Sequence, residues 1–138
     1  MPLLYITRKE HFNAAHQLWN PLWSDEKNLA TFGKCANPHF HGHNFDLYVC
    51  VKGQPHPETG LVMDLKQLKL IIRKQVIDDL DHQNLNLDVA WLKGTMPSIE
   101  TIAVGIWNRL TPHLPQGVQL HKITLWETPN NFVEYFGE

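Results

Sequence analysis

Two long stretches of the chain alternate between apolar and polar residues with a period of two. Side chains of a β-strand point alternately to its two faces, so each stretch predicts a strand with one face toward a core. The first stretch runs from Leu4 to His16 and the second from His41 to Lys52. Arg8 and Glu10 interrupt the apolar parity of the first, where we expect an exposed or twisted segment.

Two other stretches carry apolar residues at helical spacing. The first follows Asp64, a residue type that favours the N-cap, and its apolar positions are Leu65, Leu68, Ile72 and Val76. The second follows Pro97-Ser98 and ends before Pro112. Its apolar positions are Ile99, Ile102, Ala103, Ile106, Trp107 and Leu110. Both are predicted to be amphipathic helices.

Two final strands, about Leu120 to Glu127 and Phe132 to Phe136, flank the turn residues Pro129-Asn130-Asn131. The predicted order is therefore strand, strand, helix, helix, strand, strand. This order favours an α+β fold, a four-stranded antiparallel sheet with both helices on one face. We expect one domain over residues 1–138, with a loop and a short helical turn between Gln17 and Pro38. The open edges of such a sheet favour assembly.

Composition excludes several classes of function. The 138 residues carry a formal net charge of -2, with no basic patch for nucleic acid and no basic amphipathic helix for a membrane surface. No apolar run approaches the length of a membrane span. The two cysteines, Cys35 and Cys50, give no disulfide framework, so a cytoplasmic location is expected.

Three histidines fall where apolar side chains are expected. His41 and His43 begin the apolar face of their strand, and His16 ends that of the first strand. A buried polar group without a hydrogen bond costs roughly 1–3 kcal/mol, so each imidazole needs a partner. Hydrogen-bonded core histidines explain any one of them alone. The three together favour a metal, with zinc as the expected ion and an open fourth position of the catalytic type.

Four further residues are candidates for chemistry: Cys35, the Asp81-His82 pair and Glu127, each with a simpler alternative. Cys35 lies in a predicted loop beside Lys34, which favours a reactive thiolate, although a lone cysteine is usually a small buried hydrophobe. Asp81 could orient His82 as a proton relay, although an acidic helix terminus is more often solvated surface. Glu127 ends a strand on its apolar parity and could bind the planar edge of a guanine or pterin ring, or could be merely exposed.

Taken together, these motifs resemble the 6-pyruvoyltetrahydropterin synthase family over essentially the whole chain. The matching segments are Phe12-Asn13-Ala14-Ala15-His16, Ser24-Asp25-Glu26-Lys27-Asn28-Leu29, Phe32-Gly33-Lys34-Cys35-Ala36-Asn37-Pro38, His41-Gly42-His43-Asn44, Leu80-Asp81-His82, Trp126-Glu127-Thr128 and Asn130-Asn131. Their order and spacing make the resemblance highly specific.

The resemblance implies a zinc ion on the three histidines, a base at Cys35 and a relay through Asp81 and His82. The substrate-contacting residues that it implies are Glu127, Glu100 and Ser98. It also implies a T-fold, in which three sheets close into a barrel, two trimers stack as a homohexamer, and active sites lie between subunits. The implied substrate is 7,8-dihydroneopterin triphosphate, converted to 6-pyruvoyltetrahydropterin with loss of triphosphate.

The sister activity is the main alternative, a 6-carboxytetrahydropterin synthase of the queuosine (deazaguanine) pathway, which releases acetaldehyde from the same substrate. The five residues between Cys35 and His41 favour the pyruvoyl type. His39, Phe40 and Ile99 depart from the family pattern and could reshape the pocket. A non-catalytic zinc or pterin-binding module and a Cys–His hydrolase are further alternatives. The hydrolase lacks an oxyanion-hole motif and leaves the three histidines unexplained.

Overall fold

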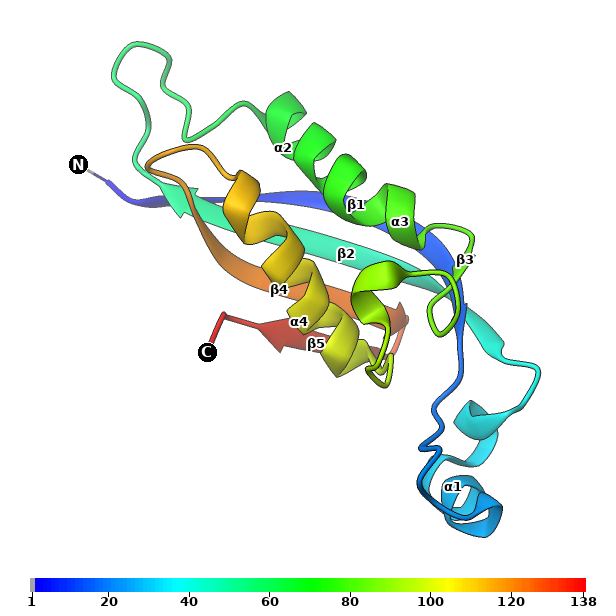
Figure 1. Ribbon diagram of the computed structural model, residues 1–138. Helices are drawn as coiled ribbons and strands as arrows, with labels where there is room; N and C mark the ends of the chain where they lie inside the picture. Colours follow the sequence, from blue (N-terminus) through cyan, green and yellow to red (C-terminus); the bar gives the residue numbers. More distant parts are fainter. Residues whose placement is uncertain (1) are drawn as a thin grey trace.

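The computed structural model describes residues 2–138, and its centre is a long twisted sheet. The five strands lie in the order β3-β1-β2-β4-β5 (Figure 1). The strands are β1 (Leu4–His16), β2 (His41–Gly53), β3 (Gln83–Asn84), β4 (Gln119–Thr128) and β5 (Asn131–Tyr135). Neighbouring strands are antiparallel except β3, which pairs parallel to β1. The predicted four-stranded antiparallel sheet is confirmed, with β3 as a short addition at one edge.

Two helical segments cover one face of this sheet (Figure 1). One is a continuous run of α2 (Leu65–Ile72), a π-helical turn (Arg73–Ile77) and α3 (Asp78–Leu80). The other is α4 (Ile99–Leu110). The remaining elements are α1 (Asp25–Phe32) and the 3-10 turns Gly33–Ala36, Ala90–Leu92 and Thr111–His113. The α+β prediction is confirmed, and none of the helices within residues 2–138 has the length and apolar character of a membrane span.

Both covering helices begin as their N-cap residues predict. The Asp64 side chain accepts a hydrogen bond from the Lys66 backbone N–H at 2.9 Å, and Ser98 accepts one from that of Thr101 at 3.2 Å. Such bonds satisfy amide groups that a helix start leaves unpaired. Leu65, expected on the apolar stripe of α2, is 50% exposed because it lies in the first turn, at the margin of the covered face.

The core lies between the sheet and these helices, as the alternation predicts. Fully buried side chains alternate along β2 and β4, and the apolar stripes of α2 and α4 pack onto them. The largest fully buried side chains of the core are Phe12, Phe45, Leu47, Leu68, Ile72, Leu80, Leu85, Ile102, Ile106, Leu110, Ile123 and Leu125. Burial on this scale rigidifies the strands whose ends carry the histidines.

Three features differ from the sequence-based expectations. Glu10 was expected on an exposed or twisted segment, but its side chain is only 7% exposed. Its burial is possible because Arg8 and Arg73 both donate hydrogen bonds to its carboxylate. The segment predicted as a loop with a helical turn forms the eight-residue helix α1, capped by Ser24. The strand β3 could not be predicted, since two residues carry no periodicity.

Candidate metal centre and active site

The register of β1 and β2 brings three imidazoles together at one end of the sheet. His16 pairs directly with His41, and His43 lies two residues further along the same face of β2. The ring centroids are 4.5 Å apart for His16 and His41, 4.9 Å for His41 and His43, and 5.2 Å for His16 and His43. The predicted convergence of these side chains is confirmed.

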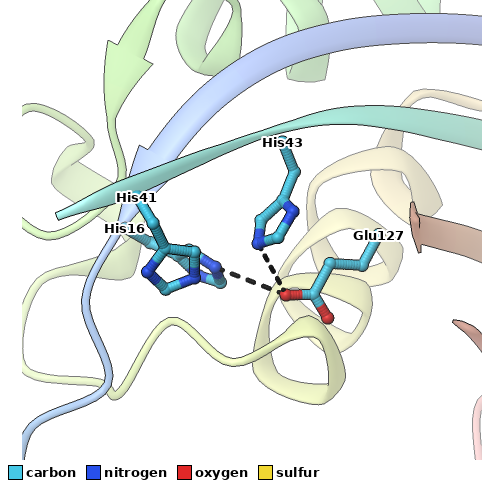
Figure 2. A group of neighbouring side chains, drawn as sticks. All are labelled: His16, His41, His43 and Glu127. Atoms are coloured by element: carbon cyan, nitrogen blue, oxygen red, sulfur yellow. Dashed lines mark ion pairs between the residues drawn. The ribbon is translucent and has the colours of Figure 1, made fainter. Parts of the chain in front are cut away.

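A fourth side chain, Glu127, approaches the histidines from β4 (Figure 2). Its Oε1 lies 3.0 Å from Nε2 of His43 and 3.5 Å from Nε2 of His16. The pairing of β4 with β5 shifts register between Trp126 and Thr128, so Glu127 lies at an irregularity of this pairing. Ile123 and Leu125 are buried on the core face of β4, and regular alternation puts Glu127 on the same face. This apolar parity was the sequence signal for the placement of Glu127.

The donor set is suited to a metal ion. One ligand atom from each of the four side chains lies within 4.8 Å of all the others. Nε2 of His16 and His43 and both ring nitrogens of His41 are buried without a hydrogen-bond partner. Buried polar atoms in folded proteins nearly always have a partner, so unpartnered nitrogens on three neighbouring imidazoles call for one. A cation with affinity for imidazole and carboxylate could bind one nitrogen of each ring together with the carboxylate.

The electrostatics of the cluster favour neutral imidazoles, the form that binds metals. The pKa of His41 is lowered, mainly by burial and to a lesser extent by the neighbouring His16 and His43. Glu127 opposes this shift. Burial also lowers the pKa of His43, against the opposing effect of Glu127. Desolvation outweighs the carboxylate in both cases.

A hydrogen bond to a backbone carbonyl, which no sequence pattern predicts, holds His16. Its Nδ1 lies 2.7 Å from the backbone oxygen of Pro97, and its side chain is 1% exposed. A carbonyl oxygen can only accept, so Nδ1 carries the proton and Nε2 is left with its lone pair toward the cluster. The contact is between a side chain and the backbone of a residue 81 positions away, which no local pattern encodes.

Asp81 and His82 form the pair that the sequence suggested. Nδ1 of His82 lies 3.0 Å from Oδ2 of Asp81, and the Asn13 backbone N–H donates to Oδ1 of Asp81 at 2.9 Å. The Asn13 hydrogen bond is the largest cause that lowers the pKa of Asp81, and the hydrogen bond from His82 adds to it. The His82 backbone N–H also donates to the Asn13 carbonyl at 2.6 Å, so β1 clamps the pair from its backbone.

The other predicted site residues lie outside the four-residue cluster. Cys35 is half-buried in the 3-10 turn Gly33–Ala36. Ser98 caps α4 and donates to Thr101 Oγ1 at 3.1 Å, and Glu100 is exposed in the first turn of that helix. Within one chain, therefore, the structure joins the three histidines and Glu127, and it leaves Cys35, the Asp81-His82 pair and Glu100 outside this cluster.

Two surface hollows meet at the Gly42-His43-Asn44 segment. One, of about 600 Å³, is lined by His43 together with His82 and the strand β3. The other, of about 380 Å³, is lined by His43, Trp126 and Glu127. His43 thus borders both hollows, one beside His82 and the other beside Glu127.

The chain is similar to known proteins over nearly its whole length. Residues 5–138 match the sequence profile of the family described as 6-pyruvoyl tetrahydropterin synthase. The chain belongs to the 6-pyruvoyl tetrahydropterin synthase family. It is 44% identical over 133 residues to the 6-pyruvoyl tetrahydrobiopterin synthase of Homo sapiens, which covers 96% of this chain and 91% of that protein. The corresponding Drosophila melanogaster protein is 38% identical over 136 residues, or 99% of this chain and 81% of that one.

A solved structure shows the same architecture. The Caenorhabditis elegans 6-pyruvoyl tetrahydropterin synthase superposes with a TM-score of 0.92 at 38% identity, covering 100% of this chain and 98% of that one. This 6-pyruvoyl tetrahydropterin synthase family member therefore has the fold that its sequence resemblance implied, and its histidine and carboxylate cluster is compatible with a metal ion.

Proposed function

We propose that this protein is a zinc-dependent lyase that converts 7,8-dihydroneopterin triphosphate to 6-pyruvoyltetrahydropterin and triphosphate. The observation that carries the proposal is the convergence, beside Glu127, of three imidazoles that each have a buried nitrogen without a hydrogen-bond partner, in a chain of this family. Three neutral nitrogens and a further position are the ligand set of catalytic zinc. The human and fruit-fly relatives described above support the pyruvoyl product.

The chemistry requires a positive centre beside groups that can move protons. Zinc held by His16, His41 and His43 would polarise the hydroxyls of the substrate side chain and acidify the adjacent C–H bonds. Cys35, as a thiolate, takes a proton from the side chain and returns one to the ring system. The pterin ring accepts the reducing equivalents of its own side chain, so no redox cofactor is required, and triphosphate leaves by elimination.

His82 supplies the second acid–base group. Its Nδ1 is bound to Asp81, so the free Nε2 is the nitrogen that exchanges protons with substrate. The His82 side chain is 75% exposed in one chain, which supports a site completed by a neighbouring subunit. We propose a homohexamer of two stacked trimers in which Cys35 and the Asp81-His82 pair of different subunits meet, each subunit being one pterin synthase domain over residues 1–138.

The substrate ring would be held by carboxylates at the two sides of the site. Glu127 and Glu100 can each accept the paired N–H groups of a pterin edge, and Ser98 can donate or accept beside Glu100. Glu100 is exposed in the first turn of α4 and is free for such a contact. A planar edge with two donors matches the two oxygens of a carboxylate, which favours a pterin over a non-aromatic substrate.

Product analysis tests this function. The zinc-loaded protein is incubated with 7,8-dihydroneopterin triphosphate, and the pterins, triphosphate and acetaldehyde are quantified. A 6-pyruvoyl pterin with one triphosphate per turnover supports the proposal. Release of acetaldehyde with a 6-carboxy pterin would assign the sister activity, and binding without turnover would assign a binding module. Cys35→Ala, which leaves the metal ligands in place, should bind zinc and lose turnover.

A further inference from the structure

The 3-10 turn that carries Cys35 lies outside the sheet and its covering helices. This turn and α1 lie beyond the end of β1 and the start of β2 (Figure 1). Two hydrogen bonds tie the turn to the residues that follow β1. The Leu18 backbone N–H donates to the Cys35 carbonyl at 2.8 Å, and Nε2 of Gln17 donates to the Ala36 carbonyl at 3.0 Å. These bonds set the place of the thiol relative to His16, the last residue of β1.

The side chain of Asn86 holds Gln17 as a neighbouring strand would. The Gln17 backbone N–H donates to Oδ1 of Asn86 at 2.8 Å, and Nδ2 of Asn86 donates to the Gln17 carbonyl at 2.9 Å. The carboxamide thus presents the acceptor and the donor of a peptide group. It extends the parallel pairing of β1 with β3 beyond Ala15, whose carbonyl accepts from the Leu85 N–H at 2.8 Å. Asn86 is itself held, because its N–H donates to Oδ1 of Asn84 at 2.9 Å.

We propose that Gln17 and Asn86 are positioning residues that hold the Cys35 thiol at a fixed place relative to His16. The inference rests on the proposed function, from which Cys35 takes its role as a base. Gln17 directly follows His16 in the chain, and its side chain binds the residue after Cys35. Proton transfer depends strongly on such placement, since a misplacement of roughly 1 Å can slow a reaction by about 100-fold.

The burial of Ala36 makes the Gln17 side chain hard to replace. Ala36 is fully buried, so its carbonyl has no ready access to water. Without the Gln17 donor this carbonyl would lose a partner, and the turn would have to shift to find another. A glutamate in place of Gln17 would set a carboxylate oxygen against the carbonyl, and both groups are acceptors. The turn, and the thiol with it, would then move away from β1.

The test measures kcat, KM and zinc content of the full zinc-loaded chain with 7,8-dihydroneopterin triphosphate. Gln17→Glu removes the donor to the turn, and Asn86→Ala removes both bonds to the Gln17 backbone. Each should lower kcat by about 10- to 100-fold at unchanged KM and zinc content. Gln17→Lys keeps an N–H donor and should recover most of kcat. The matched control Gln54→Glu makes the same change at an exposed residue after the far end of β2, and it should alter none of these quantities.

Amide hydrogen exchange reports the clamp without turnover. The Leu18 N–H, which is bonded to Cys35, should exchange at least about tenfold faster in Gln17→Glu, while core amides keep their protection. The double variant of Gln17→Glu and Asn86→Ala should lose no more kcat than the larger single loss, because both residues act through one chain of contacts.

Three outcomes would overturn the inference. They are a wild-type kcat in both single variants, a loss of kcat that follows lost zinc or unfolding, and fully additive losses in the double variant. A purely structural role predicts lower stability with an unchanged kcat of the folded protein. Failure of the proposed function is seen in the wild type, as absence of the pyruvoyl product, and it would overturn both. Failure of the inference alone is seen as Gln17 and Asn86 variants that turn over like an active wild type.

Discussion

Nδ1 of His16 lies 2.7 Å from the backbone oxygen of Pro97, and this contact joins the end of β1 to the residue before the cap of α4. The turn is tight, because the Ser98 N–H donates to the Met96 carbonyl at 2.8 Å around Pro97. The Pro97 carbonyl belongs to the same planar peptide as the Ser98 N–H, so this hydrogen bond also holds the carbonyl. The carbonyl in turn determines which nitrogen of His16 faces the other imidazoles.

The first prediction concerns the tautomer of His16. In the metal-free protein at neutral pH, His16 should be the Nδ1–H tautomer, which ¹⁵N chemical shifts of its ring identify. Pro97→Gly loosens the turn and should weaken zinc binding by about tenfold, the range expected for a residue that orients a ligand. Pro57→Gly, in an exposed loop, is the control and should have no effect on zinc. An Nε2–H tautomer of His16 in the wild type would contradict the prediction.

The second prediction is a dependence of stability on pH that comes from Asp81. The Asn13 N–H and the His82 ring hold the pKa of Asp81 below its ordinary value of 3.8 in the folded state. The unfolded chain therefore binds this proton more readily, so the contribution is fully present above pH 3.8 and is lost as the pH falls through the folded pKa. Asp81→Asn should be less stable than wild type near pH 7, by about 1 kcal/mol, in urea unfolding. The gap should close at lower pH, and a constant gap would refute the assignment.

The third prediction distinguishes a catalytic role of His82 from a purely structural role. His82 has a φ of 61°, a left-handed conformation that asparagine tolerates better than most residues. His82→Asn should keep the fold and the zinc but lose turnover by about 10²–10⁴-fold, as expected for loss of a general acid–base group. Circular dichroism and metal analysis serve as controls. Unimpaired turnover would exclude His82 from proton transfer.

The fourth prediction concerns the buried carboxylate of Glu10. Its Oε1 accepts from Arg8 at 3.0 Å and from Arg73 at 3.1 Å, between β1 and the π-helical turn. Glu10→Ala should lower the free energy of unfolding by about 1–3 kcal/mol, since it removes charge-assisted hydrogen bonds from both arginines. Arg73→Met should cost less, because Arg8 still pairs with the buried charge. Equal losses in chemical denaturation would show that the two arginines do not share the carboxylate in this way.

Much of the fold follows from periodicity. The alternation in β1 and β2 predicted which face of each strand is buried, and Ser98 and Asp64 predicted where two helices begin. Periodicity could not reveal β3, which is too short, nor the burial of Glu10, whose partner Arg73 is 63 positions away. A charge on an apolar face is normally taken as exposed, and only the partner that folding brings to it reverses that expectation.

The sequence by itself determined that His16, His41 and His43 lie on core-facing positions, because strand parity is a local property of the chain. It also determined the adjacency of Asp81 and His82 and placed Glu127 on an apolar parity. Tertiary structure alone decided the pairing of His16 with His41, the carbonyl that orients His16, and the backbone clamp of Asn13 on the acid–base pair. It likewise decided that Glu127 lies 3.0 Å from His43, because β4 is the neighbour of β2 in the sheet. These contacts join segments far apart in the chain through backbone atoms and strand register, and both depend on how the whole sheet and its covering helices pack.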